Sequence, residues 1–471
     1  APVGQDPLSY ARNKLCGIWL EGKNTPSVCY IQDIKTSSVA GQVCSITALT
    51  CYTLIPFIDT SATTGFTIKF SMQRAFDVDY AGTSKNPEGT TNFPLAVIFY
   101  QQRLIIAGTQ GDTMQMIFSK QGIYNDFASD YSGNNAFQLR LGGTEQQTIQ
   151  NVIANQGIQI YTDIAEWIIN DAIISAASGF TNNSETGSNG VQPIISANGT
   201  TLFCPKDGLG LIGFIYSYEN ANFATPPISI LTDIYDNAIS DLILKKSNSP
   251  NSDNLIFSTL ENGKMVVGNY LSDQQIQAFT GQYNTGDYYK QALQIEDDLF
   301  FIVERNGKIV LEIEDEDEPS FCCTSNPTYN NTTGVISGIS LYNSRLVNIY
   351  DGNGDFVESG TVTAGTYTIV RAIKPTTVSC IGYNIHSTFT SNPINVGKET
   401  FALTKSIRKI DLVITDDTKS DYITINGKKG RRSGNLLTFT KVSKPLRECT
   451  YTIENDKYLV DILSIDIDYE A

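Results

Sequence analysis

The chain offers few residues that could carry out covalent or metal chemistry. His386 is the only histidine, so a Ser-His-Asp or Cys-His site would have to use it. It is flanked by polar residues on a predicted strand, which favours an ordinary exposed histidine. No ligand spacing typical of a structural zinc site is present, and no Walker A or G-x-G-x-x-G motif precedes a predicted helix. The sequence therefore predicts no catalytic, cofactor-binding or metal-binding residues and no cofactor.

Carboxylates are abundant, and two groups of them could serve chemistry. The densest charge run is EIEDEDE, Glu312 to Glu318, whose hard oxygens would suit Ca²⁺ or Mg²⁺, but the D-x-D-x-D-G loop pattern is missing. Asp163 and Glu166 are one example of a pair that glycoside cleavage could use. Since acidic β-rich proteins offer many such pairs, the simpler interpretation is a solvated acidic loop and an unremarkable pair.

The cysteines are better explained as free thiols than as a disulfide framework. They are odd in number, scattered over a long chain and without any C-x-x-C pair, which is typical of a protein folded in a reducing cytosol. Adjacent Cys322 and Cys323 could form only a strained bridge, so two reduced thiols are expected there. The nine positions are Cys16, Cys29, Cys44, Cys51, Cys204, Cys322, Cys323, Cys380 and Cys449.

Charge and hydropathy limit the kinds of partner that the chain is expected to bind. With 33 basic and 49 acidic residues, the net charge is −16, so the chain is a poor candidate for gripping nucleic acid through its phosphates. The basic segment KKGRR, Lys428 to Arg432, is expected to be a solvated turn, with phosphate or an acidic neighbouring subunit as the alternative partner. The first twenty residues lack the pattern of a signal peptide, and no apolar run approaches the roughly 20 residues of a membrane span.

The elements that must position these residues are predicted to be short strands. Between Phe93 and Ala172, short apolar runs are separated by Gly and Asx clusters about every 8–12 residues, which is typical of a meandering antiparallel β-structure. Runs this short must join a radial or layered array of sheets to bury their faces. The predicted strands in this stretch cover Leu95–Tyr100, Arg103–Ala107, Met114–Phe118, Phe137–Leu141, Ile149–Ala154 and Gln159–Thr162.

Turn chemistry predicts further hairpins. Asn-Gly and Asp-Gly pairs flanked by apolar residues favour tight turns because their residues tolerate positive φ. Such pairs are Asn198-Gly199, Asp207-Gly208, Asn262-Gly263, Asn306-Gly307 and Asn426-Gly427. One short amphipathic helix is expected after Pro226-Pro227, because Leu231, Ile234, Tyr235, Ala238 and Leu242 follow a helical spacing.

Composition divides the chain into a few domains. Length alone indicates roughly two to four, and PSFCCTSNPTYNNTTG breaks the apolar periodicity. We expect an N-terminal arm at 1–25, a β-propeller-like domain at 26–318, a linker at 319–334 and a C-terminal antiparallel β domain at 335–471. The expected fold class is mainly β with few short helices.

An ordered set of motifs adds a family resemblance. FYQQRL, AGT, FSKQGIYNDF and IYTDIAEW follow one another as similar segments do in the tail hub proteins of short-tailed bacteriophages, the tail tubular protein B family. YTLIPFIDTSATTGFTIKFS before them, and NGTTLFCPKDGLGLIGFIYSYE and YLVDILSIDIDYE after them, continue the likeness. It runs from about Tyr52 to the end of the chain, and it is a likeness of ordered pattern without a catalytic signature.

The resemblance implies a structural virion protein and no enzyme. Such a protein folds in the host bacterial cytoplasm and forms a homo-oligomeric ring, expected as a hexamer, that is the hub or nozzle of the tail. The implied partners are other tail ring or adaptor proteins, tail fibres or receptor-binding proteins, and genomic double-stranded DNA that passes through the lumen without specific binding. One alternative is a virion-associated glycoside hydrolase or lyase acting on surface polysaccharide. Another is a bacterial carbohydrate-binding propeller, although blade repeats and a signal peptide are not evident.

Overall fold

The computed structural model shows an all-β chain that divides into two compact units, Ala1–Leu299 and Phe300–Ala471. Side-chain environments are described from residue 94 onward. The described backbone covers 15–20, 27–37, 45–53, 68–72, 94–109, 112–124, 127, 136–143, 145–196, 199–217, 222–230, 233–245, 255–271, 276–282, 287–296, 298–315, 321–384, 386–392, 406–415, 421–443, 449–457 and 462–470.

The first unit begins with a four-stranded antiparallel sheet of order β3-β2-β1-β4. Its strands are β1 (Leu15–Leu20), β2 (Ser27–Ser37), β3 (Ser45–Thr53) and β4 (Ile68–Met72). Residues 15–20, which were expected to belong to an N-terminal arm, therefore pair with two neighbouring strands of this sheet.

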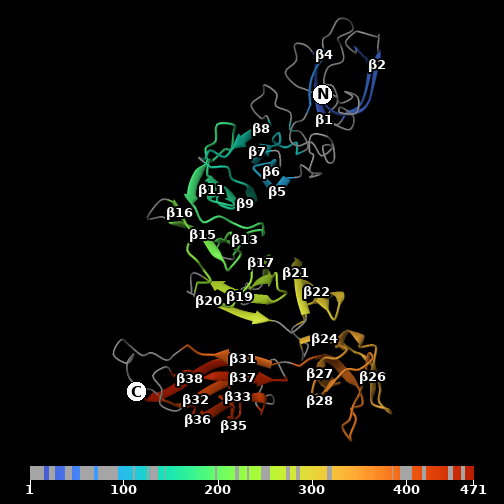
Figure 1. Ribbon diagram of the computed structural model, residues 1–471, viewed down its shortest axis with the longest axis vertical. Helices are drawn as coiled ribbons and strands as arrows, with labels where there is room; N and C mark the ends of the chain where they lie inside the picture. The colour runs from blue at the N-terminus through green and yellow to red at the C-terminus, as the bar shows by residue number, and fades with distance from the viewer. Residues whose placement is uncertain are drawn as a thin grey trace. The chain divides into compact units, whose positions relative to one another are not determined.

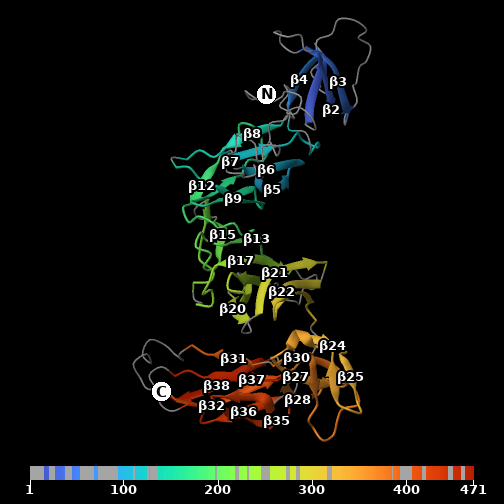
Figure 2. The same cartoon turned by 45° about the vertical axis from the view of Figure 1, so that its right-hand side comes forward.

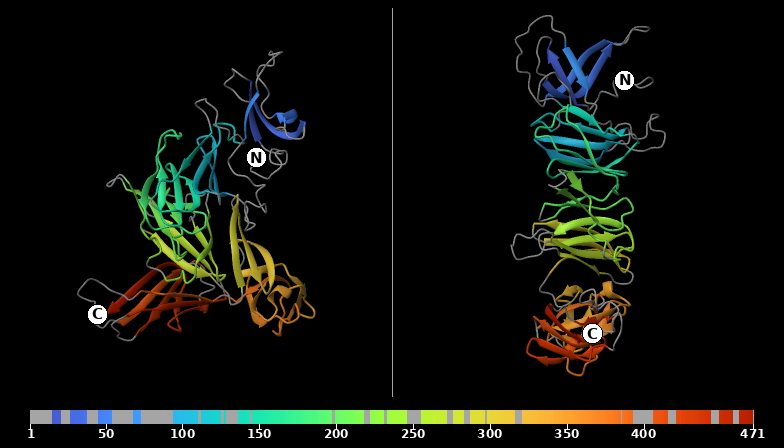
Figure 3. Two further views of the ribbon diagram at one scale, coloured as in Figure 1. Left: turned by 45° about the horizontal axis from the view of Figure 1, so that its top comes forward. Right: turned by 90° about the vertical axis from the view of Figure 1, so that its left-hand side faces the viewer.

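Four further antiparallel sheets follow, and in each the neighbouring strands are also consecutive in the sequence (Figure 1). This is the up-and-down connectivity of propeller blades, and Figure 3 shows the same succession of sheets from two other sides. The first sheet holds β5 (Pro94–Tyr100), β6 (Arg103–Thr109), β7 (Asp112–Phe118) and β8 (Phe137–Arg140). The second holds β9 (Ile149–Ala154), β10 (Ile158–Thr162), β11 (Glu166–Ile169) and β12 (Thr181–Ser184). The third holds β13 (Ile194–Ile195), β14 (Thr201–Phe203), β15 (Ile212–Ser217) and β16 (Asn222–Ala224). The fourth holds β17 (Ile239–Lys245), β18 (Leu255–Leu260), β19 (Met265–Leu271) and β20 (Ile276–Gln282), and β21 (Asp287–Ile295) follows it.

Apolar clusters join each of these sheets to the next. Met116 and Phe118 of β7 pack with Ile160 and Trp167, which come from the following sheet. The other face of that sheet contributes Tyr161 and Ile168 to a second cluster, where they meet Phe203, Phe214 and Phe223 of β14–β16. A third cluster then links β14 to β17–β19. Because both faces of β10 are covered, all five of its residues are buried.

The second unit contains five groups of strands. β22 (Asp298–Arg305), whose first residues precede the unit boundary, pairs with β23 (Lys308–Ile313). One sheet has the order β24-β30-β27-β28, with β24 (Phe321–Ser325), β27 (Leu346–Asp351), β28 (Phe356–Thr361) and β30 (Val378–Tyr383). A smaller one contains β25 (Thr328–Asn330), β26 (Val335–Ser337) and β29 (Thr366–Thr368), and a 3₁₀ turn, η3 (Ser340–Tyr342), lies between them in sequence.

The last two sheets of this unit form a sandwich (Figure 2). Their orders are β31-β37-β33-β34 and β35-β36-β32-β38, and residues of both fill one apolar cluster that includes Ile410, Ile425, Phe439 and Ile453. The strands are β31 (His386–Thr390), β32 (Ser406–Ile414), β33 (Ile423–Ile425), β34 (Lys428–Lys429), β35 (Arg431–Ser433), β36 (Leu436–Thr440), β37 (Thr452–Asp456) and β38 (Ile462–Glu470).

The structure confirms the mainly β fold class and the hairpins predicted at Asn262-Gly263, Asn306-Gly307 and Asn426-Gly427. The prediction at Asn198-Gly199 is not tested, because Asn198 lies outside the described residues. Asn306 and Gly307 have φ of 50° and 74° and join β22 to β23. Asn426 and Gly427 have φ of 49° and 71° and join β33 to β34. Two consecutive positive φ values are what a type I′ hairpin turn requires, and this requirement is local to the dipeptide.

The predicted amphipathic helix is wrong. Residues 233–238 are irregular, residues 231–232 lie outside the described part, and β17 begins at Ile239. Ile239, Leu242 and Leu244 of β17 are buried in the apolar cluster that links β14 to β17–β19, and Ile234 and Tyr235 pack against it from the irregular segment. Of the described residues with helical spacing, only Leu242 lies in a strand.

The unit boundary also differs from the predicted linker. The division falls at 299/300, ahead of the expected 319–334. Within that range β24 pairs with β30, and β25 pairs with β26. In the described part of the chain, no helix is long and apolar enough to cross a membrane.

Candidate functional site

The only histidine lies in an exposed hydrogen-bonded pair. His386 pairs with Asp456 across β31 and β37, and its Nδ1 lies 2.7 Å from Asp456 Oδ1. The two side chains are 53% and 52% exposed, and β31 is an edge strand. Within the described residues, no serine or cysteine side chain hydrogen-bonds the imidazole. A nucleophile-base pair of the kind used in covalent catalysis is therefore not assembled here.

Asp163 and Glu166, the suggested carboxylate pair, have different hydrogen-bond partners and different roles. Asp163 Oδ1 accepts a hydrogen bond of 2.7 Å from the Thr148 backbone N–H. Glu166 is fully buried, and its Oε2 accepts hydrogen bonds from the Ser184 hydroxyl and the Thr186 backbone N–H. Because Glu166 is closed off from solvent, it cannot act on a polysaccharide in this conformation.

Burial dominates the electrostatics of Glu166. It raises the pKa of this carboxyl to about 7, although the hydrogen bonds from Ser184, Thr186 and Gly187 oppose the shift. Glu166 Oε1 has no hydrogen-bond partner among the described residues. Across the β10–β11 pair it faces Tyr161, whose pKa burial also raises. Burial therefore disfavours the charged form of both groups.

The motif IYTDIAEW stabilises the connection between β10 and β11. Thr162 Oγ1 accepts a hydrogen bond of 2.9 Å from the Ala165 backbone N–H and lies 2.9 Å from Gln147 Oε1. The same Gln147 oxygen accepts a bond of 3.0 Å from Trp167 Nε1. These contacts are buried and internal, so the motif has a structural role that the sequence did not reveal.

The acidic run supplies the counterion of a buried arginine. Arg305 is fully buried, and its Nε and Nη2 donate to the two carboxylate oxygens of Glu312. Nη2 also lies 2.6 Å from Cys322 Sγ, and the guanidinium stacks 5.4 Å from the ring centre of Tyr383. Glu312 is thus a structural partner and differs from the solvated residue expected of this run; residues 316–320 lie outside the described part.

The adjacent cysteines sit on a bulge and are not bridged. The register of β24 shifts between Phe321 and Thr324, and Cys322 packs with one apolar cluster while Cys323 packs with another that contains Cys380. None of the five cysteines whose side chains are described forms a disulfide. No group of three or more His, Cys, Asp or Glu residues able to hold a metal occurs within the described residues.

Strand β23 exposes its apolar side chains to solvent and turns Glu312 toward a buried partner. Ile309, Leu311 and Ile313 are 71%, 67% and 53% exposed, whereas Glu312 on the opposite face binds the buried Arg305. Since alternate residues point to opposite faces, the apolar face of β23 is turned outward. Phe300 and Ile302 of β22 extend it, because they pair directly with Ile313 and Leu311. We call these five residues the outer face.

Basic residues occupy two edge strands of the sandwich. Lys428 and Lys429 form β34, and Arg431 and Arg432 open β35; all four are exposed. β34 and β35 each end the strand order of their sheet, so each leaves one side without a strand neighbour among the described residues. The segment is therefore placed where another chain could reach it.

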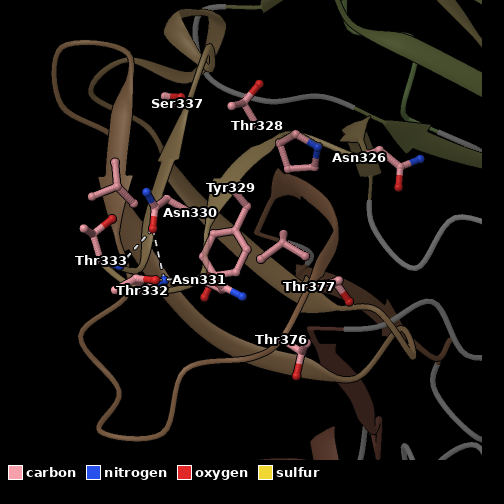
Figure 4. Close-up of a pocket in the computed structure, with 13 residues that line it drawn as sticks. Asn326, Thr328, Tyr329, Asn330, Asn331, Thr332, Thr333, Ser337, Thr376 and Thr377 are labelled. Carbon is pink, nitrogen blue, oxygen red and sulfur yellow. Dashed lines mark hydrogen bonds between the residues drawn. The ribbon is translucent and has the colours of Figure 1, made fainter.

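A polar cavity of about 1000 Å³ lies beside β25 and β26 (Figure 4). Its lining combines Asn326–Thr333, Val335 and Ser337 with Thr376–Val378. Figure 4 shows Tyr329 among these residues, with Thr376 and Thr377 on a separate segment. Nothing in the sequence marked this site, since its two parts are about forty residues apart and consist of ordinary turn residues.

No protein family and no curated protein matches the sequence. Among solved structures, the chain is similar to Raptor of Chaetomium thermophilum at 12% identity and a TM-score of 0.32, with 62% of this chain and 28% of that chain covered. A quinoprotein alcohol dehydrogenase-like protein of Bacteroides thetaiotaomicron gives 8% identity, a TM-score of 0.28 and 64% coverage of each chain. PorZ of the type-IX secretion system of Porphyromonas gingivalis gives 10% identity and a TM-score of 0.23, with 81% of this chain and 66% of that chain covered. The chain thus spans 28% to 66% of these proteins, and such low TM-scores carry no argument about function.

Proposed function

We propose that the chain is a structural subunit of a short phage tail, the hub or nozzle that surrounds the DNA-ejection channel as a homo-oligomeric ring. The observation that carries the proposal is the outer face, because it turns three large apolar side chains of one strand to water while Glu312 of the same strand contacts the buried Arg305. Exposed apolar patches of this kind mark contact surfaces. The ordered motifs that resemble those of tail hub proteins are the reason for assigning this contact to a ring of the tail hub.

The free energy gained by covering the outer face is of the size expected for part of a contact between subunits. Covering the exposed parts of Ile309, Leu311 and Ile313 would contribute roughly 1–2 kcal/mol each, or about 3–6 kcal/mol together. Association costs at least about 4 kcal/mol in lost freedom of motion. The outer face therefore acts as the centre of a larger interface, to which pairing along the edge of β23 would add.

Charge clusters of opposite sign support a head-to-tail arrangement. Glu314 and Asp315 of the acidic run follow β23, and the basic segment Lys428–Arg432 lies at the sandwich edges. A contact between two different surfaces of identical subunits closes into a ring when its rotation allows. The net charge of −16 also fits a lumen through which DNA slides without being held.

The test is the mass of the full chain in solution, measured by sedimentation and native mass spectrometry. We expect a closed ring for the natural sequence and loss of that ring on Leu311→Asp, which places a charge in the centre of the contact. Ile373→Asp is the matched control, because Ile373 is 84% exposed but lies outside the outer face. A monomer that is indifferent to Leu311→Asp would refute the proposal.

The same preparation also tests whether the protein is an enzyme. Incubation with capsular polysaccharide, followed by an assay for new reducing ends or unsaturated ends, should give no product if the role is structural. Product formed by a monomer would favour the virion-associated hydrolase or lyase instead.

A further inference from the structure

The cavity beside Tyr329 is large and open enough for a ligand of several rings. It lies between β25 with the turn that follows it, β26, and the segment that enters β30. Its volume of about 1000 Å³ is at the upper end of the range of roughly 300–1,000 Å³ that ligand pockets occupy. All of its lining belongs to the second unit, so the cavity does not depend on how the two units are arranged.

The lining selects against charged and purely apolar ligands. None of its thirteen residues is charged, and ten carry a side-chain hydroxyl or amide. An anionic ligand would meet no cation in the lining; the nearby Lys374 ammonium donates a bond of 2.6 Å to the Thr333 carbonyl. An apolar ligand would cover polar groups without pairing them, which costs free energy.

Several hydroxyls in the cavity are available to a ligand. Thr328, Thr376 and Thr377 are exposed, and Ser337 is half-buried. Their side chains make no hydrogen bond to another described residue, whereas Asn330 Oδ1 is already used by the backbone N–H groups of the turn. Each free hydroxyl can donate one hydrogen bond and accept others, as the hydroxyls of a sugar do.

Tyr329 provides a fixed aromatic surface beside the segment of Thr376 and Thr377, on the face of β25 opposite to Thr328 (Figure 4). Its phenol donates a hydrogen bond of 3.0 Å to the Pro375 carbonyl, and its half-buried ring packs against the cluster around Ile336. The ring is therefore held in place before a ligand arrives, which reduces the entropic cost of binding. A sugar presents both hydroxyls and apolar C–H faces, so it can use the ring together with the hydroxyls of Thr376 and Thr377, which follow the Pro375 that the phenol contacts.

We infer that this cavity binds an uncharged oligosaccharide. No carboxylate lines it, so the pair of acids that glycoside cleavage needs is missing from the lining and the sugar is bound without being cut. The inference stands apart from the proposed tail role, since it concerns a separate surface and requires no ring.

Isothermal titration of the full chain tests the inference directly. The probes are maltohexaose, cellohexaose and mannohexaose as neutral chains, and hexagalacturonate as an anionic one. We expect at least one neutral chain to bind in the micromolar to millimolar range and hexagalacturonate to bind more weakly. Because each lost hydrogen bond reduces affinity several-fold, the double variant Thr376→Val, Thr377→Val should weaken binding by about tenfold or more.

Thr361→Val is the matched control, since Thr361 is exposed at the end of β28 and lies outside the cavity. It should leave the affinity unchanged, and unchanged thermal melting of all variants should show that they are folded. Failure of every neutral chain to bind, equal binding of hexagalacturonate, or equal affinity in the double variant would each overturn the inference. None of these results would alter the mass of the assembly, so the two proposals fail independently.

Discussion

Replacing Glu166 by Gln should change how the stability of the first unit depends on pH. Glu166 is fully buried opposite Tyr161, and burial raises the pKa of its carboxyl from 4.5 to about 7. The folded state therefore holds a proton that the unfolded chain releases above pH 4.5. Gln imitates the neutral carboxyl in size and has no charge to desolvate.

The direction and size of the effect follow from proton linkage. Below pH 4.5 both states carry the proton, and the natural protein has the full stabilisation from this group. As the pH rises from 4.5 to about 7 the unfolded state ionises first, so stability is lost, and above 7 the loss is complete. A pKa difference of this size corresponds to about 3 kcal/mol. The stability of Glu166→Gln relative to the natural protein should therefore increase by about 3 kcal/mol between pH 4.5 and 8.

The neighbouring tryptophan allows the pH dependence of this stability difference to be measured in the first unit alone. Trp167 is buried beside Glu166, and the chain has only one other tryptophan, Trp19. In a Trp19→Phe background, urea unfolding followed by Trp167 fluorescence reports on the β9–β12 sheet at each pH. Glu185→Gln is the control, because it makes the same substitution at an exposed residue that directly follows β12 and does not share the buried environment of Glu166.

A stability difference that stays constant from pH 4.5 to 8 would refute the reasoning, because it would mean that Glu166 ionises normally in the folded state. A water-filled path to the carboxylate would produce that result. A difference that decreases with pH would mean that the hydrogen bonds from Ser184 and Thr186 outweigh burial.

Three further predictions concern packing and turns. Glu312→Gln should destabilise the second unit by about 3 kcal/mol in thermal unfolding, because Arg305 stays buried without its counterion; a loss below 1 kcal/mol would show that water replaces the carboxylate. Gly307→Ala should cost about 1 kcal/mol through its φ of 74° alone, since no atom lies near the added methyl group; calorimetry that shows no loss would contradict this. Gln147→Leu should cost about 1–3 kcal/mol and shift Trp167 emission, because the indole N–H loses its acceptor; an unchanged spectrum would argue against that bond.

Local chemistry made the turns and most strands predictable. Positive φ at Asn306-Gly307 depends on those two residues alone, and the short apolar runs from Leu95 to Thr162 correspond closely to β5–β10. The helix expected near Tyr235 failed because Ile234 and Tyr235 are packed into an apolar cluster from an irregular segment that precedes β17. That cluster is formed with residues of β14 and β17–β19, which a short stretch of sequence does not reveal.

The candidate sites were much less predictable than the fold. The cavity beside Tyr329 joins residues 326–337 to Thr376–Val378, and ordinary threonines at that separation give no signal in a sequence. The tail hub resemblance came from ordered motifs, and it remains a prediction to be tested by the mass of the assembly.

By itself, the sequence determined the positive-φ turns, the short alternating strands and hence the mainly β class, because these depend on residues a few positions apart. Only the tertiary structure decided which face of each strand is buried. In β23 it places Glu312 against Arg305 and leaves Leu311 in water. Alternation fixes that the two side chains point in opposite directions, but burial depends on which distant elements pack against each face.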